Sequence, residues 1–168
     1  MAVTVLHRIA GEPAPVGAAS FGDVPAGQWY SDAVAWAAEK EIAQGFAGRF
    51  RPNDKITRQE LVTLLYRYDQ LDVSQARTGE QNLIPAPGPE EVVPGGPSII
   101  LPEFPDWIQG SGAYTDLDKI ADWAVEPFVW AMETGVITGN DDGTLDPQGN
   151  ALRCQFAAMI QRYHQTIT

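Results

Sequence analysis

The residues of this chain whose types and spacing best suit binding chemistry are Thr57-Arg58-Gln59-Glu60. Thr57 and Glu60 have the spacing of a capping box, in which each side chain binds a backbone N–H of the other at the start of a helix. The box places Arg58 at the first helical position, where free N–H groups and the helix dipole favour an anion. Two interpretations follow: structural capping alone, or a carboxylate or phosphate site around Arg58.

Catalysis is a weaker interpretation of the same acidic residue. A hydrolase could pair Glu60 with Asp116, because two carboxylates can act as acid and base around one bond. Nothing in the sequence marks a nucleophile, however, and the cap already engages Glu60. We therefore predict that the protein is not an enzyme.

Metal binding is not predicted either. His7 and His164 lie far apart in the sequence, and no cysteine or acidic ligand is paired with them. Cys154 fits a small buried thiol better than a reactive one. The acidic segment 140–146 lacks the spacing of a calcium-binding loop and has the composition of a solvated turn. We expect no metal and no cofactor.

Composition limits the class of protein. A chain of 168 residues with 44% hydrophobic residues can form one packed domain, and its net charge of −11 argues against a nucleic-acid partner. One cysteine excludes an internal disulfide framework, and no apolar run is long enough to predict membrane insertion. Residues 1–10 do not resemble an export signal. If the protein works outside the cell, we expect the exporting segment to be absent from this sequence.

The candidate residues belong to a repeated pattern, which indicates units that stack on copies of themselves. Each copy is predicted to be a helix, a tight loop and a second helix. The first copy contains Phe21-Gly22-Asp23-Val24, Trp29, Trp36, Gly45, Phe50-Arg51-Pro52 and Arg58, and the second contains Tyr114-Thr115-Asp116-Leu117, Trp123, Trp130, Gly139, Leu145-Asp146-Pro147 and Arg153.

A third, partial copy opens the chain. Segments 2–9, 61–68 and 156–163 share apolar residues at i, i+3, i+4 and i+7, the pattern of a helix with one buried face. We therefore expect residues 1–17 to be the last helix of a truncated repeat. The equivalent arginines of the three segments are Arg8, Arg67 and Arg162.

Segment 71–113 separates the two fuller copies. It holds seven of the 13 prolines, so it is predicted to be an inserted, partly extended loop. Its apolar clusters, Val92-Val93, Ile99-Ile100-Leu101 and the segment 104–108, keep open the alternative that the loop packs on another surface.

Taken together, the motifs resemble the S-layer homology module. The matching residues are Phe21 to Val24, Trp29, Ile42 to Gly45, Phe50 to Pro52 and Ile56 to Glu60. The resemblance implies an all-α fold in which helix-loop-helix repeats form a pseudo-threefold bundle around three central helices. The expected units are a truncated repeat (1–17), a complete repeat (18–70), the insertion (71–113) and a complete but degenerate repeat (114–168).

The resemblance also implies a function. Modules of this family attach proteins non-covalently to secondary cell-wall polysaccharide, often pyruvylated, in grooves between adjacent repeats. By analogy Arg58 would pair with the ketal carboxylate, and Trp29 or Trp123 would stack on a sugar. The best candidate groove combines Arg58 and Glu60 with the Trp123 region opposite. The predicted ligand-binding residues are Arg58, Gln59, Glu60, Trp29, Trp123, Arg153, Asp23, Asp116, Gly45 and Gly139.

Departures from the family pattern keep a second function open. Leu152 and Gln155 replace the threonine and glutamate of the motif, so the second copy loses both the capping hydroxyl and the carboxylate. The alternative is a structural or assembly module with decayed grooves. We expect an extracellular protein of the cell wall or S-layer, with a homo-oligomer or a missing repeat covering the truncated face. On the anchoring interpretation, Arg58→Ala should weaken polymer binding and leave the fold intact.

Overall fold

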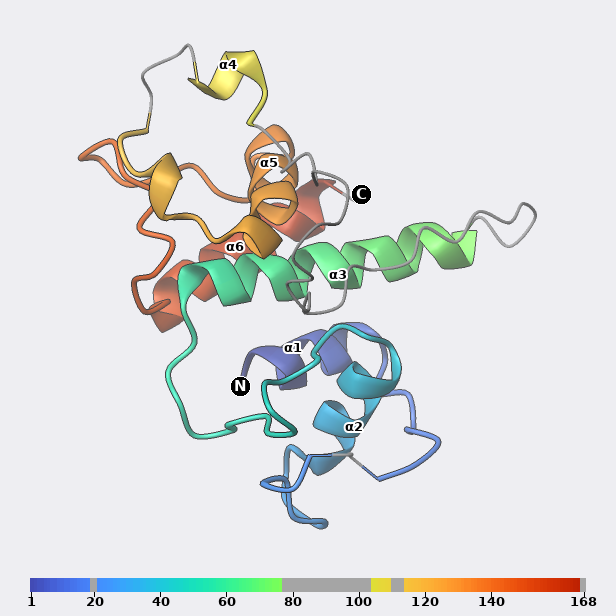
Figure 1. Ribbon diagram of the computed structural model, residues 1–168. Coiled ribbons are helices and arrows are strands. Elements are labelled where there is room, and N and C mark those ends of the chain that lie inside the picture. The colour runs from blue at the N-terminus through green and yellow to red at the C-terminus, as the bar shows by residue number, and fades with distance from the viewer. Residues whose placement is uncertain (19–20, 77–103, 110–113, 167–168) are drawn as a thin grey trace, which may run out of the picture.

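The computed structural model describes residues 1–18, 21–76, 104–109 and 114–166 (Figure 1). Helices dominate these residues, and the backbone pairing outside them is limited to two isolated bridges, Phe46 with Arg49 and Thr57 with Asn150. The predicted all-α class is confirmed. The elements are α1 (Ala2–Ile9), α2 (Ser31–Glu39), α3 (Arg58–Ala76), α4 (Asp106–Gln109), η1 (Leu117–Lys119), η2 (Asp122–Ala124), α5 (Val125–Glu133) and α6 (Arg153–Thr166).

The helices follow the repeated pattern of the sequence. α2, a loop and α3 form the first full repeat, and η2 with α5, a loop and α6 form the next. α1 packs on α2 and α3, while α3 packs on α5 and η2, so α3 lies between the two halves (Figure 1). α1, α3 and α6 occupy equivalent positions, because each is the second helix of its repeat.

One apolar cluster joins the repeats. Leu6 of α1 and Leu65 of α3 are fully buried in it. The ring of Tyr68 in α3 lies 6.2 Å from Trp36 of α2 and 6.0 Å from Tyr163 of α6. Full burial of a leucine side chain stabilises the fold by about 2 kcal/mol. One hydrophobic core therefore spans the repeats.

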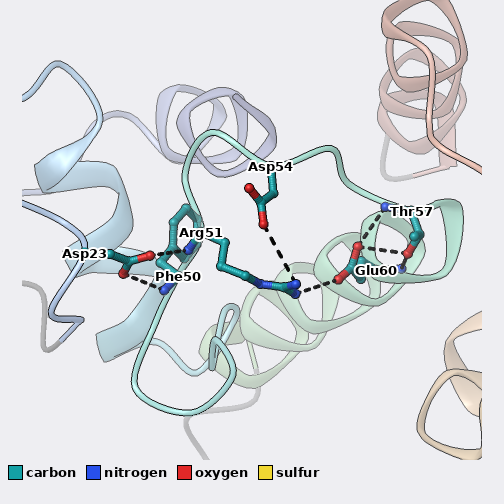
Figure 2. Close-up of polar contacts among 6 residues, drawn as sticks. All are labelled: Asp23, Phe50, Arg51, Asp54, Thr57 and Glu60. Atoms are coloured by element: carbon teal, nitrogen blue, oxygen red, sulfur yellow. Dashed lines mark hydrogen bonds and ion pairs between the residues drawn. The ribbon is translucent and has the colours of Figure 1, made fainter.

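A carboxylate holds the turn before each second helix. Asp23 accepts hydrogen bonds from the backbone N–H groups of Phe50 and Arg51, both at 2.8 Å, and the bond from Phe50 is the main reason that its pKa lies below the ordinary value (Figure 2). Asp116 is 3% exposed and accepts the equivalent pair of bonds from residues 145 and 146, also at 2.8 Å. Asp116 therefore shapes the turn that packs on the start of α3, and Asp23 shapes the corresponding turn within its own repeat.

The predicted insertion is described only at its two ends. α3 extends to Ala76, past the expected boundary at residue 71. Phe104 packs against the core cluster and Ile108 is 2% exposed, as expected for a segment that packs on the domain. The apolar clusters at 92–93 and 99–101 lie outside the described residues. Of the helices in the described segments, none has the length and hydropathy needed to cross a bilayer.

Candidate ligand-binding crevices

The capping box at the start of α3 is confirmed. The N–H of Thr57 donates to Glu60 Oε2 at 2.7 Å, and the N–H of Glu60 donates to Thr57 Oγ1 at 3.3 Å. Arg51 forms an ion pair with the same glutamate, with 3.5 Å between its Nη2 and Glu60 Oε1 (Figure 2). Its Nη1 also lies 4.0 Å from Asp54 Oδ2. Glu60 is thus engaged by its own helix and by an exposed arginine.

Arg58 lies inside the molecule instead of at a ligand-facing helix end. It is 4% exposed, and its Nε donates to the carbonyl of Leu145 at 2.7 Å. The backbone N–H groups of Arg58 and Gln59 donate to Gly149 and Pro147, each at 2.9 Å. The turn of the next repeat therefore fills the helix end. The prediction that Arg58 projects toward ligand is wrong, because that turn uses the donors which an anion would need.

The charge of Arg58 is balanced within the fold. Burial lowers the pKa of its guanidinium, while the nearby carboxylates of Asp146 and Asp116 act in the opposite direction. A buried cation with a hydrogen bond and acidic neighbours is a structural arrangement that is costly to break. Arg58 thus joins the two full repeats.

The other predicted residues lie apart from one another. Gln59 is half-buried, and its side chain accepts the N–H of Ala121 at 3.2 Å, next to η2, where Trp123 is 51% exposed. Arg153 is exposed at the start of α6. Trp29 is 70% exposed at the entrance to α2, and it lines a pocket to which Trp123 does not contribute.

Gly45 and Gly139 have structural reasons to be glycine. Their φ angles are 66° and 72°, a region that favours glycine. A Cβ on Gly45 would lie 2.5 Å from the carbonyl oxygen of Arg49, and one on Gly139 would lie 2.5 Å from the ring of Tyr114. Both clashes lie within the repeat, so these residues are required by the turn itself.

A pocket of about 350 Å³ lies between α1 and the start of α2, and we call it the first crevice. Trp29 forms part of its wall, beside Arg8 and Asp32. Arg8 is exposed and forms an ion pair with Glu12, with 3.5 Å between Nε and Oε1. Asp32 is also exposed, and among the described residues its carboxylate has no hydrogen bond or ion pair. An aromatic face, a guanidinium and a free carboxylate therefore meet in one crevice.

His7 supports the wall of the first crevice. It is 9% exposed, and its Nε2 lies 2.9 Å from the carbonyl oxygen of Pro13. Its ring lies 5.2 Å from the ring of Trp36, at a tilt of 50°. These contacts tie the segment after α1 to the helix pair and fix the position of the pocket's edge.

The three arginines that are equivalent in the repeat pattern have different surroundings. Arg67 and Arg162 donate to the carbonyl groups of Ile42 and Val136 at 3.5 and 3.4 Å, so each holds its own repeat together. Their equivalent Arg8 instead lies at the crevice. The repeat alignment already identified the three arginines, but it could not show which of them lacks a carbonyl to bind. Nowhere in the described part of the chain do three or more His, Cys, Asp or Glu side chains gather as a metal site requires.

Fold and site together define a helical-repeat module with a polar, aromatic-edged crevice between repeats. A family model for the S-layer homology domain matches residues 20–62 and 113–157, which is over half of the chain. The chain belongs to the S-layer homology family.

Curated relatives include large proteins. The chain is 28% identical over 141 residues to the amylopullulanase of Thermoanaerobacterium thermosulfurigenes and 28% identical over 140 residues to the exoglucanase XynX of Acetivibrio thermocellus, matches that cover 83% of this chain. It is 40% identical over 78 residues, or 45% of the chain, to the outer membrane protein SlpA of Thermus thermophilus. The matches span 6%, 10% and 8% of those relatives.

Proposed function

We propose that this chain is a non-catalytic module that holds a protein at the bacterial cell surface by binding secondary cell-wall polysaccharide in the first crevice. The observation that carries the proposal is the meeting of Trp29, Arg8 and Asp32 in one pocket between repeats. Membership of the S-layer homology family supports the general role. The names of the relatives, two polysaccharide-degrading enzymes and one outer membrane protein, fit a module carried by larger surface proteins.

The chemistry of the crevice favours an acidic sugar unit, such as a hexose with a pyruvate ketal. The guanidinium of Arg8 can bind the ketal carboxylate through two parallel hydrogen bonds once its exposed pair with Glu12 opens. That pair costs little to open, because exposed ion pairs contribute about 0.5 kcal/mol. Asp32 can accept hydrogen bonds from sugar hydroxyls, and the exposed ring of Trp29 offers an apolar face for stacking.

Binding to purified cell-wall sacculi, with and without chemical removal of the polysaccharide, tests the proposal. We expect the intact chain to sediment with untreated sacculi only. Arg8→Ala and Trp29→Ala should each weaken binding by about tenfold or more, because each removes a contact with the sugar. Arg153→Ala and Trp123→Ala are matched controls on exposed residues outside the first crevice and should bind as the parent does. Equal losses in the controls would overturn the assignment of the site.

An assembly role is the second candidate function, and the start of α6 favours it. Leu152 is 58% exposed there and Arg153 is exposed, whereas the same position in α3 is covered by a neighbouring turn. In this second candidate function, a turn from a second copy of the chain covers that helix start. Sedimentation velocity over a range of concentrations separates the two functions, since assembly requires a concentration-dependent oligomer that Leu152→Asp abolishes.

A further inference from the structure

His7 is the titratable side chain of the first crevice to which the proposed function gives no role in binding. It lies in the last turn of α1 and lines the pocket beside Arg8 and Asp32. Guanidinium and carboxylate groups ordinarily keep their charge from about pH 5 to pH 8, whereas imidazole changes its charge in that range. His7 is therefore the group that can change the charge of the crevice near neutral pH.

One ring nitrogen of His7 is fixed by the backbone. Nε2 lies 2.9 Å from the carbonyl oxygen of Pro13, and a carbonyl oxygen can only accept. We therefore assign the hydrogen of the neutral ring to Nε2, which leaves Nδ1 with its lone pair. Among the described residues Nδ1 has no hydrogen-bond partner, and it keeps contact with solvent. Protonation of the ring places a hydrogen on Nδ1 and turns an acceptor into a charged donor.

The surroundings of the ring can accommodate an imidazolium. The last turn of α1 is the negative end of the helix dipole. The ring of Trp36 in α2 lies 5.2 Å away at a tilt of 50°, within range of a cation–π contact. The charged groups of the pocket are Glu12, which follows α1, Asp32 of α2, and Arg8, which opposes a second cation. The ion pair of Arg8 with Glu12 at 3.5 Å reduces that opposition.

An acidic sugar would distinguish the two forms of the ring. The lone pair of neutral Nδ1 faces an anion unfavourably, because both groups are acceptors. Protonated Nδ1 instead donates a charge-assisted hydrogen bond to a carboxylate. Ligand and proton therefore strengthen each other's binding, and the coupling has the same size in both directions.

We propose that His7 is a ligand contact in the first crevice and that its protonation at Nδ1 strengthens the binding of an acidic sugar as the solution becomes mildly acidic. This inference rests on the proposed function for the ligand class and adds a dependence on pH. The proton comes from solvent, and the bond from Nε2 to Pro13 stays in place. The added affinity is present while the imidazolium persists and is lost as rising pH removes its proton.

Isothermal titration calorimetry of the intact chain at about pH 5.5 and about pH 8 tests this inference. The probe is a methyl hexopyranoside with a 4,6-linked pyruvate ketal. We expect about fivefold tighter binding at the lower pH. Near neutral pH, buffers of different ionisation enthalpy should reveal proton uptake on binding. The methyl ester of the same ketal carries no negative charge, so it should show no gain at the lower pH.

Two variants assign the effect to one residue. His7→Gln keeps an amide donor for Pro13 without a titratable ring, so its affinity should be the same at both pH values. His164→Gln changes the other histidine, on α6, and should keep the pH dependence of the parent. Both variants retain the amine of Met1, whose pKa is lowered by burial. A gain that survives in His7→Gln would belong to that amine and would overturn the inference.

Nuclear magnetic resonance of the imidazole gives a second measurement that needs no variant. The midpoint of the His7 Cε1–H titration should move to higher pH when the probe is present, whereas that of His164 should stay unchanged. An unmoved His7 midpoint, or equal affinity of the parent at the two pH values, overturns the inference. Failure of the probe to bind at either pH would instead overturn the proposed function.

Discussion

The starts of α3 and α6 carry the same arginine in opposite environments. Arg58 is 4% exposed and bonded to the carbonyl of Leu145, whereas Arg153 is exposed at the equivalent place. The difference arises from the neighbouring turn, which lies over α3 and has no counterpart over α6 among the described residues. A motif residue therefore has no fixed role: the element that packs on it decides whether it joins repeats or faces solvent.

The N-terminal caps of α3 and α6 also differ, and the cap of α3 is the more complete. In α3 the box is reciprocal, with Thr57 and Glu60 each accepting an N–H of the other. In α6 the side-chain oxygen of Gln155 accepts the N–H of Leu152 at 3.0 Å, and the hydroxyl half is missing. This copy lacks the hydroxyl and the carboxylate of the motif, but it keeps one bond of the cap, because the amide oxygen of glutamine accepts as a carboxylate does.

Arg58→Ala should produce the largest effect. The change removes a buried charged hydrogen bond and leaves Leu145 O and the nearby Asp116 without their cation, which should cost about 3 kcal/mol. For a domain of this size the melting temperature should fall by about 9 °C. Thermal unfolding followed by circular dichroism measures the change.

The matched control for that prediction is Arg153→Ala. Its side chain is exposed and has no recorded partner among the described residues, so the melting temperature should stay within about 1 °C of the parent. Similar losses for both variants would show that the two helix starts are alike in solution. The earlier expectation that Arg58→Ala spares the fold is reversed by the burial of this side chain.

Thr57→Ala should have an intermediate effect. Thr57 Oγ1 accepts the N–H of Glu60 and donates to the carboxylate at 2.9 Å, and loss of this cap should cost about 1 kcal/mol. Chemical denaturation gives the free energy of unfolding. Thr57→Ser keeps the hydroxyl and should retain most of the stability. A serine variant as unstable as the alanine variant would contradict a capping role.

Local patterns in the sequence predicted the helices and the cap, because those depend on residues three or four apart. The all-α class, the repeated helices and the box at Thr57 all follow from such spacing. The direction of Arg58 depends on a turn 87 residues away in sequence, which spacing cannot place. The first crevice was missed for the same reason, since Arg8 and Asp32 come from different repeats and meet only after packing.

Leu152→Thr should sharpen the comparison by giving α6 the missing half of its cap. Leu152 is 58% exposed, so little apolar burial is lost, and a threonine hydroxyl at this position can accept a free N–H of the first turn. We expect a gain of about 0.5 kcal/mol, or about 1.5 °C in melting temperature. The same change in a Gln155→Ala background should gain a similar amount, because the two halves of the box bind different N–H groups. Loss of stability in either background would mean that Leu152 contributes through packing, which would instead support a covered helix start and an assembly role.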